Sequence, residues 1–424
     1  MNHTKRLISN FLSLSSVQVA NYILPLITVP YLVRVLGPEK FGLIAFAQAF
    51  IAYFALLTDY GFNLSATRAV SINRDNKDKI SEIFCSVVLI KIVFMVINFL
   101  ILCILVFSFR KFRDEWLLYL LTFSMIFGNV LFPVWFFQGL ERMKQIASLN
   151  IIAKIIFTAS VFIFIRSQSD YIYLPVINSV VFITAGIISL WIVLTKIKIK
   201  IKIPSINEVK YQLKEGWHIF ISTLAISLYT VSNTFILGLF TNNTVVGYYS
   251  AGEKIIRAVQ SLMGPLSQTI YPYISKLASE SRELTLEFVR KVVKLVGIAT
   301  LGISFMLLIF AHQISDIVLG IQFKESIMVI QILSFLPFII GLSNIFGIQV
   351  MLNFGLKQVF SRILIIASFI NILIALILVA PFQHIGISFS VLITEIFVTI
   401  AMFFVLQRHG LKVLQFMASP EIVK

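Results

Sequence analysis

The stretch "GYYSAGEKIIRAVQSLMGPLSQTIYP", residues 247–272, places three charged side chains in a segment that is otherwise largely apolar. Glu253, Lys254 and Arg257 lie within about two turns of a helix. In water such charges cost little, but a charge at the centre of a bilayer costs on the order of 2.5 to 3.5 kcal/mol. The purpose of these charges therefore depends on the class of the protein, which the composition of the whole chain decides.

The composition predicts an integral membrane protein. Of the 424 residues, 58% are hydrophobic and 13% are charged, and the mean hydropathy is +0.95. One soluble core cannot bury so much apolar surface. A helix that crosses a bilayer needs about 20 apolar residues, and the chain has room for about twelve such runs. We predict an all-α membrane protein with spans near residues 11–33, 41–63, 83–107, 116–138, 148–165, 171–194, 217–240, 251–274, 292–312, 326–350, 359–380 and 385–407.

The distribution of lysine and arginine predicts the orientation of these spans. With both termini in the cytoplasm, cytoplasmic segments hold 24 of the 35 basic residues, the opposite side holds seven, and four lie inside spans. Positive charge concentrates in the cytoplasmic loops of membrane proteins, so we expect both termini in the cytoplasm. The net charge of +16 then reflects short loops that face an anionic leaflet, and no nucleic-acid partner is expected.

The densest basic segment is "KIKIKIKIP", residues 196–204. Its alternation also suits an amphipathic strand or a nucleic-acid patch. Between two apolar runs, however, it is more typical of a linker that faces lipid at the membrane surface. Membrane lipids are therefore expected partners of this segment.

Two pairs of similar segments indicate an internal duplication. "GLIAFAQ" (42–48) corresponds to "GYYSAGE" (247–253), 205 positions later, and "MKQIASLNII" (143–152) to "LKQVFSRILI" (356–365), 213 positions later. Six helices repeated once give two lobes of equal orientation around a central cavity. We expect an N-terminal lobe at residues 1–195, a basic cytoplasmic linker at 196–216, a C-terminal lobe at 217–407 and a cytoplasmic tail at 408–424.

The sequence lacks the motifs that would indicate an enzyme. No HExxH, Gly-rich phosphate loop, CxxC or DxD-type metal motif is present, and the five histidines are scattered. The connections between spans are roughly 20 residues at most, too short for a catalytic domain. We therefore expect a transporter with no catalytic residues, no metal site and no cofactor.

Four segments resemble a known family: "YLVRVLGPEKFGLIAFAQAFIAYFALLTDYGFNLSATR" (31–68), "GLERMKQIA" (139–147), "VVGYYSAGEKIIRAVQSLMGPLSQTIYPYISKL" (245–277) and "SFSVLITE" (388–395). They are similar to bacterial O-antigen flippases of the Wzx type, in the multidrug, oligosaccharidyl-lipid and polysaccharide exporter superfamily. The resemblance implies movement of an undecaprenyl-diphosphate-linked oligosaccharide from the cytoplasmic to the periplasmic leaflet of the inner membrane. It also implies a polysaccharide polymerase and a chain-length regulator as possible partners.

Such a substrate explains the three charges of the opening stretch. A lipid diphosphate is anionic and pairs best with fixed Arg or Lys side chains. Lys254 and Arg257 are three residues apart, so they share a helix face, and Glu253 can neutralise Arg257 from four residues before it. We predict that this face binds diphosphate. Snorkelling to the membrane surface with a local ion pair is the alternative.

Further charges in or beside the spans of the first lobe are candidates for binding or charge pairing. Lys91 and Lys154 lie deeper in their spans and are expected either to pair with Asp59 or to face the cavity. Arg34 follows the first span and is either an interface anchor or a substrate ligand. Asp59 has Arg68 as an alternative partner, since Arg68 follows the second span closely.

The spans of the second lobe contain one more acid, Glu395, near the middle of the last helix. A carboxylate in a bilayer suggests a functional site, here for coupling to H⁺ or Na⁺. A hydrogen bond to a neighbouring helix is the competing explanation, and the sequence does not identify the coupling ion.

Prolines and a glycine interrupt two of the spans. Pro25 and Pro30 lie in the first, and Gly264 with Pro265 follows Arg257 in the eighth. A proline removes a backbone hydrogen bond and bends a helix. We predict hinges at these positions, with static kinks as the alternative.

Two other functions compete with the flippase. A drug or cation antiporter of the same superfamily would concentrate acids, whereas the spans hold four bases against Asp59, Glu253 and Glu395. A membrane polysaccharide polymerase or glycosyltransferase would be an enzyme with a large external loop, for which the predicted spans leave no room.

Overall fold

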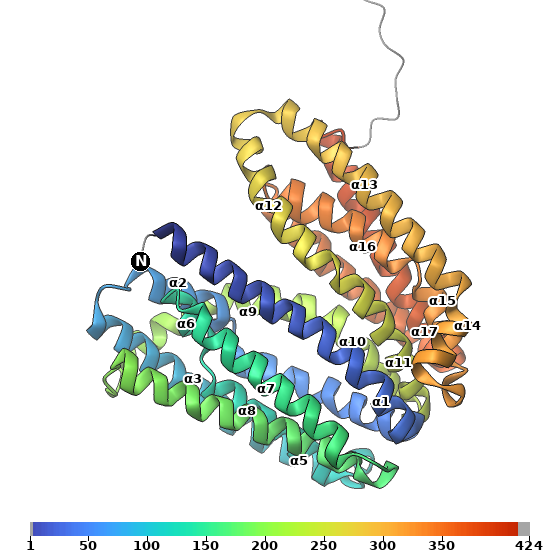
Figure 1. Ribbon diagram of the computed structural model, residues 1–424, viewed down its shortest axis with the longest axis horizontal. Helices are drawn as coiled ribbons and strands as arrows, with labels where there is room; N and C mark the ends of the chain where they lie inside the picture. The colour runs from blue at the N-terminus through green and yellow to red at the C-terminus, as the bar shows by residue number, and fades with distance from the viewer. Residues whose placement is uncertain (1–2, 414–424) are drawn as a thin grey trace, which may run out of the picture. The chain divides into compact units, whose positions relative to one another are not determined.

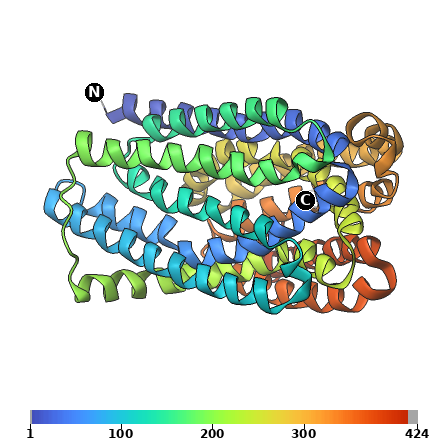
Figure 2. The same ribbon diagram turned by 90° about the horizontal axis from the view of Figure 1, so that it is seen from below.

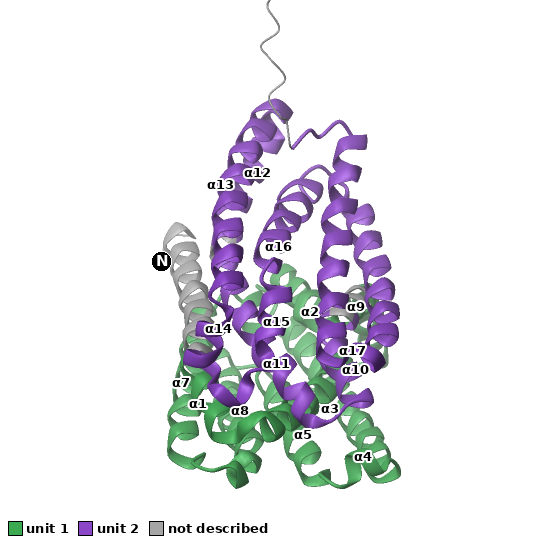
Figure 3. Cartoon of the chain, turned by 90° about the vertical axis from the view of Figure 1, so that its right-hand side faces the viewer, with its two compact units in different colours: residues 1–227 green, residues 228–424 purple. Residues whose placement is uncertain are grey.

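The structure of the protein is a computed structural model that describes residues 3–413, without the side chains of residues 3–23 and of a few later positions. Every regular element within residues 3–413 is a helix. The chain forms two compact units, Met1–Ser227 and Leu228–Lys424, called unit 1 and unit 2 (Figure 3). The predicted all-α class is confirmed.

Unit 1 is a bundle of long helices linked by short turns (Figure 1). The pairs α5 with α8, α1 with α7 and α2 with α6 pack most extensively. The last helix, α9, runs three residues past the end of the unit. The helices are α1 His3–Asp59, α2 Phe62–Ile72, α3 Lys77–Ser108, α4 Arg110–Arg113, α5 Trp116–Leu131, α6 Val134–Gly139, α7 Met143–Phe164, α8 Tyr173–Ile192 and α9 Ile206–Thr230, with single turns at Gln168–Ile172 and Val193–Ile197.

Unit 2 is also a bundle of helices, in which α17 packs against α10, α15 and α16. Its helices are α10 Ser232–Phe240, α11 Asn243–Ser261, α12 Met263–Glu280, α13 Arg282–Ile309, α14 Ala311–Ile314, α15 Ser326–Leu333, α16 Leu336–Asn344 and α17 Lys357–Arg408, with short helical turns at Ser315–Leu319, Ile321–Phe323 and Ile345–Met351.

Small residues allow the helices of each unit to approach closely. A Cβ atom added to Gly128 on α5 would lie 2.9 Å from the Cβ of Phe182 on α8, and one added to Gly186 would lie 2.7 Å from the Cβ of Leu131. In unit 2, a Cβ at Gly252 on α11 would meet Val329 of α15 at 2.8 Å. Such contacts are typical of helix pairs in membranes, where packing replaces the hydrophobic effect as the driving force.

Eight helical stretches within the described residues are long and apolar enough to cross a membrane, fewer than the twelve runs predicted. Two of the eight, Ile27–Ile72 and Lys357–Arg408, contain kinks at Gly37 and Gln383 and so cover two predicted runs each. Helices α9 to α12, which contain the predicted runs 217–240 and 251–274, are not among the eight. The membrane class holds, and twelve is an approximate count because these helices mix charged residues with apolar ones.

The helices break at Gly37 and at Leu262, whereas the predicted hinges are Pro25, Pro30, Gly264 and Pro265. The first two spans meet at Gly37, whose φ of 69° is a left-handed conformation that glycine adopts without strain. Helix α1 continues through Pro25 and Pro30, and the side chain of Pro25 lies outside the described residues. Helices α11 and α12 separate at Leu262, so Gly264 and Pro265 lie in the first turn of α12. Proline is tolerated there because first-turn amides lack helical partners; the Pro265 side chain is also outside the description.

The predicted basic linker, residues 196–216, belongs to unit 1, and much of it packs against the helices of that unit. Val209 and Leu213 of α9 pack on the hydrophobic core formed by α2, α3, α6 and their neighbours. The next part of α9 packs against the turn that precedes α2. There the ring of Tyr60 stacks on the ring of Phe220, with 4.9 Å between the ring centroids. The first part of α9 is therefore a structural element of unit 1.

Candidate functional site

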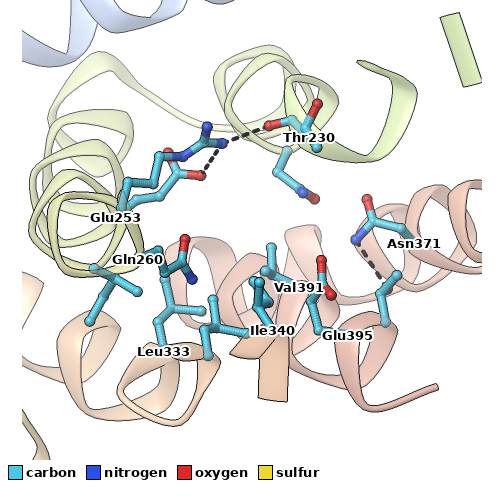
Figure 4. A pocket seen from close by; sticks show the side chains of 13 residues that line it. Thr230, Glu253, Gln260, Leu333, Ile340, Asn371, Val391 and Glu395 are labelled. Carbon is cyan, nitrogen blue, oxygen red and sulfur yellow. Dashed lines mark hydrogen bonds and ion pairs between the residues drawn. The ribbon is translucent and has the colours of Figure 1, made fainter. Parts of the chain in front are cut away.

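A pocket lined by both polar and apolar side chains lies inside unit 2, between α11 and α17 (Figure 4). Its volume of about 130 Å³ accommodates several waters or one small charged group, but not an oligosaccharide. Apolar side chains from α15 and α16 close one side. The lining residues are Thr230, Asn233, Glu253, Ile256, Arg257, Gln260, Leu333, Leu336, Ile340, Asn371, Val391, Thr394 and Glu395.

An ion pair on α11 supplies the charge of this pocket. Nη2 of Arg257 lies 2.9 Å from Oε1 of Glu253, as the spacing of four residues predicts, and also donates to the carbonyl oxygen of Thr230 at 2.9 Å. The hydroxyl of Tyr249 donates to the same Glu253 oxygen at 3.3 Å. Glu253 is 16% exposed and Arg257 is 53% exposed. The carboxylate is therefore a fixed anchor, while the guanidinium keeps a free face toward the pocket.

Lys254 does not line the pocket. Its side chain is half-buried and is not part of the pocket lining, although it is only three residues from Arg257. Residues three apart differ by about 60° around the helix axis, and here only Arg257 of the two lines the pocket. The structure therefore brings together Glu253, Arg257 and Glu395 of the predicted residues of the second lobe.

Helix α17 contributes a hydrogen-bonded polar cluster to the other side of the pocket. Nδ2 of Asn371 donates to Oγ of Ser390 at 3.1 Å and to Oγ1 of Thr394 at 3.2 Å, and Ser390 donates back to the Asn371 carbonyl at 2.9 Å. These bonds join the two arms of α17 on either side of the kink at Gln383. They hold Glu395, the next residue after Thr394, at the pocket wall (Figure 4).

Among the pocket residues, Oδ1 of Asn371 and Nε2 of Gln260 are buried polar atoms with no hydrogen-bond partner in the described part of the chain. A buried amide without a partner costs roughly 1 to 3 kcal/mol. With the Glu395 carboxylate beside them, these atoms provide one donor and several acceptors to a small polar or charged ligand.

Unit 1 contains a separate ion pair. Nζ of Lys91 on α3 lies 2.7 Å from Oδ1 of Asp59 at the end of α1, so Asp59 pairs with Lys91 and not with the predicted alternative, Arg68. About two turns further along α3, Asn98 donates to Oγ1 of Thr58 at 3.0 Å and to a backbone carbonyl of α1. The ion pair and the Asn98 hydrogen bonds hold α1 against α3.

The remaining predicted bases of unit 1 lie apart from this pair. Lys154 on α7 is half-buried, and Arg34, just before the kink at Gly37, is exposed. Arg68 on α2 is also exposed, and the described residues offer it no ion pair. Each belongs to a different helix, so the structure does not assemble the bases of unit 1 into one site.

The sequence analysis did not single out the uncharged polar residues of the pocket, which are Thr230, Asn233, Gln260, Asn371 and Thr394. A signal was present, since Asn371 interrupts the apolar run "FINILI" and Thr394 precedes Glu395. Uncharged polar residues in membrane helices commonly form bonds between helices, but the sequence does not say which ones meet.

Comparison with known proteins identifies the family. Residues 7–278 match the model of the family described as polysaccharide biosynthesis protein. A protein of Escherichia coli (strain K12) named as an O-antigen transporter is 36% identical over 95% of this chain and 97% of its own length.

Solved structures with the same fold include two membrane transporters. An inward-facing multidrug resistance MATE family transporter of the MOP superfamily has a TM-score of 0.73 at 14% identity, over 93% of this chain and 96% of its own. The lipid II flippase MurJ in an inward closed conformation has a TM-score of 0.65 at 14% identity, over 95% and 87%. The sequence matches show that the chain belongs to the polysaccharide biosynthesis protein family, and its apolar helices make it a multi-pass membrane protein.

Proposed function

We propose that this protein is a flippase that moves an undecaprenyl-diphosphate-linked O-antigen or related oligosaccharide unit from the cytoplasmic to the periplasmic leaflet. The name of the Escherichia coli relative, an O-antigen transporter, supports this substrate class. The bilayer is the bacterial inner membrane and both termini are cytoplasmic, for which the distribution of lysine and arginine is the support. A polymerase and a chain-length regulator are the proteins that would receive the product.

The observation that carries this proposal is the guanidinium of Arg257 at the pocket of unit 2. An arginine in an apolar bundle is expensive unless it is paired or binds an anion. Glu253 neutralises Arg257 with one oxygen at 2.9 Å, and the half-exposed guanidinium has donors left for a second acceptor. A diphosphate offers several oxygens in the geometry that guanidinium binds best.

The size of the pocket defines which part of the substrate it holds. A volume of about 130 Å³ suits a charged group and excludes the sugar chain and the lipid tail. Arg257 therefore binds the diphosphate, while Glu253 keeps the guanidinium oriented when no substrate is present. Lys254 in unit 2, and Lys154 and Arg34 in unit 1, are further candidates for anion contacts, whereas Lys91 is 3% exposed and already paired with Asp59.

Movement by alternating access requires flexible positions and an energy source. The breaks at Gly264 with Pro265, and the prolines at positions 25 and 30, are the proposed hinges between states. Glu395 is the proposed coupling residue for H⁺ or Na⁺, with the Asn371 cluster beside it as its scaffold. In unit 1, Asp59 is the charge-pairing residue with Lys91 as its partner, and Arg68 stays a candidate for charge pairing.

The test of this function is complementation of a strain that lacks the protein, with surface polysaccharide as the readout. Wild type restores the polysaccharide, and Arg257→Ala at equal membrane abundance does not. Arg362→Ala is the matched control, because Arg362 is an exposed arginine on α17 outside the pocket. Equal rescue by both variants would remove Arg257 from the binding site, and no rescue by wild type would refute the flippase.

The same strains separate the flippase from a drug or cation antiporter. The fold itself permits both, since the multidrug transporter shares it. A flippase restores the polysaccharide without changing resistance to cationic drugs. Increased drug resistance without polysaccharide would instead support the antiporter.

A further inference from the structure

The segment of residues 196–204, "KIKIKIKIP", crosses one end of unit 1 between α8 and α9, at the left of Figure 2. Its backbone is attached to α3. The amide of Lys200 donates to Oγ of Ser81 at 3.3 Å, the amide of Lys202 donates to Sγ of Cys85 at 3.5 Å, and Ile199 is buried beneath them. The segment is therefore a fixed edge of the unit and not a free loop.

The outward side chains of this edge combine charge with apolar surface. Ile201 is 77% exposed and Ile203 is 97% exposed, so neither packs on the protein. Lys196 and Lys198 are exposed and form no ion pair with the described residues. An exposed isoleucine beside exposed lysines is unfavourable in water but suits the boundary between lipid headgroups and acyl chains.

The start of α9 extends this surface. Its inner face carries the buried Glu208 and Gln212, whereas Lys210 and Lys214 are exposed on the outer face. Tyr211, which is 54% exposed, lies beside them. A tyrosine between lysines is typical of a helix end at the membrane interface. We call this surface, comprising Lys196, Lys198, Ile201, Ile203, Lys210, Tyr211 and Lys214, the basic edge.

Four of the six acids at this end of unit 1 pair with bases outside the basic edge, while Asp75 and Glu215 are exposed and form no ion pair with the described residues. Glu208 pairs with Lys79 at 2.7 Å, Asp78 with Lys202 at 2.9 Å, and Glu141 with Arg74 at 2.9 Å. These pairs also show that residues 64–82, 139–147 and 196–216 meet at one end, where twelve basic residues face six acidic ones. Because bases outnumber acids at this end and Lys196 and Lys198 form no ion pair with the described residues, the basic edge retains net positive charge.

We propose that the basic edge binds the headgroups of anionic phospholipids in the membrane that surrounds the protein. The lysine ammonium groups pair with the lipid phosphates, and Ile201 and Ile203 insert among the acyl chains near the headgroups. Both interactions act on one rigid edge, so a bound lipid stabilises the segment that connects α8 to α9. This function is separate from substrate transport and does not depend on Arg257.

The exposed isoleucines identify the occupant as a lipid. A soluble phosphate needs converging donors, whereas the lysines here project along an edge, and a phosphate ion would leave Ile201 and Ile203 in water. A nucleic acid would use the charge but would also leave the isoleucines without a partner. An anionic lipid satisfies both, because its headgroup carries the charge and its chains cover the apolar side chains.

The test measures binding of a fluorescent phosphatidylglycerol to the purified full-length protein in detergent, with unlabelled lipids as competitors. Lys196→Gln with Lys198→Gln is expected to weaken binding roughly thirty-fold, because each lysine near a lipid surface contributes about a factor of five. Ile201→Ser with Ile203→Ser removes no protein contact and is also expected to weaken binding. Arg110→Gln with Arg113→Gln, two exposed arginines beyond the other end of α3, is the charge-matched control and leaves binding unchanged.

Competition distinguishes the source of the phosphate. Unlabelled phosphatidylglycerol displaces the probe, whereas phosphatidylcholine and soluble glycerol phosphate do not. Wild-type affinity in both double variants at the edge, or equal competition by phosphatidylcholine, would overturn the proposal. Displacement by glycerol phosphate at a similar concentration would replace it with a site for a soluble anion. None of these results depends on polysaccharide export, so the proposal and the flippase function fail separately.

Discussion

Nζ of Lys91 lies 2.7 Å from Oδ1 of Asp59, and the two side chains differ in exposure, at 3% for Lys91 and 32% for Asp59. The pair is therefore asymmetric. Loss of the acid leaves a lysine buried without a counter-charge, whereas loss of the lysine leaves a carboxylate that solvent can reach.

This asymmetry predicts unequal costs for the two single substitutions. Asp59→Asn is expected to destabilise the protein by about 3 to 5 kcal/mol, as for a buried pair that loses one partner. Lys91→Met is expected to cost clearly less, and the double variant less than the sum of the two. Thermal unfolding of the detergent-solubilised protein measures all three, and equal losses for both single variants would contradict the burial argument.

A second prediction concerns the geometry of the Arg257 site. One Nη2 atom of Arg257 serves both Thr230 and Glu253, which leaves the rest of the planar fork for substrate. Arg257→Lys keeps the charge but loses the fork, so surface polysaccharide is expected to recover only in part. Full recovery with lysine would show that charge alone suffices at this position.

A third prediction separates coupling from binding at Glu395. Its carboxylate is at the pocket wall beside the Asn371 cluster. Glu395→Gln has nearly the same shape and is expected to fold normally but to lose transport driven by a proton or sodium gradient in vesicles. Glu395→Asp retains a titratable group and serves as the control. Unchanged gradient-driven transport in Glu395→Gln would remove the residue from the coupling mechanism.

The cluster around Asn371 makes a prediction about stability. Its amide donates to Ser390 and Thr394, and hydrogen bonds between membrane helices contribute on average about 0.6 kcal/mol each. Asn371→Ala is therefore expected to lower stability by roughly 1 to 2 kcal/mol and to loosen the two arms of α17. Phe369→Leu, at a side chain that is 67% exposed, is a nearby control without effect. Wild-type thermal stability in Asn371→Ala would mean that these bonds do not hold the kink.

The kink of α17 also depends on a close approach at Gly386. A Cβ atom there would collide with the backbone carbonyl oxygen of Leu378, across the kink. Gly386→Ala is expected to destabilise unit 2 strongly, whereas Gly302→Ala, where nothing lies within 4 Å, is expected to be neutral or stabilising by up to about 1 kcal/mol. Thermal unfolding of the two variants compares them directly, and similar stabilities would show that the kink can relax.

Much of the fold could be predicted from the sequence because it depends on local properties. Composition and the length of the apolar runs are enough to assign the all-α membrane class, and a spacing of four residues is enough to predict the pair of Glu253 with Arg257. The break near Gly37 is likewise a local property of the backbone. The ion pair and the break are each governed by residues within about two turns of one another.

The composition of the pocket and the choice among distant partners depended on tertiary structure. Glu253 and Arg257 belong to α11, while Asn371 and Glu395 belong to α17, more than a hundred positions later. Asp59 had two possible partners in the sequence, and the packing of α1 on α3 selected Lys91. The sequence alone determined the membrane class and the local ion pair on α11, and its charges predict an orientation. Only the packing of helices determined which polar side chains share a pocket, because side-chain contacts between helices depend on crossing geometry that no local pattern encodes.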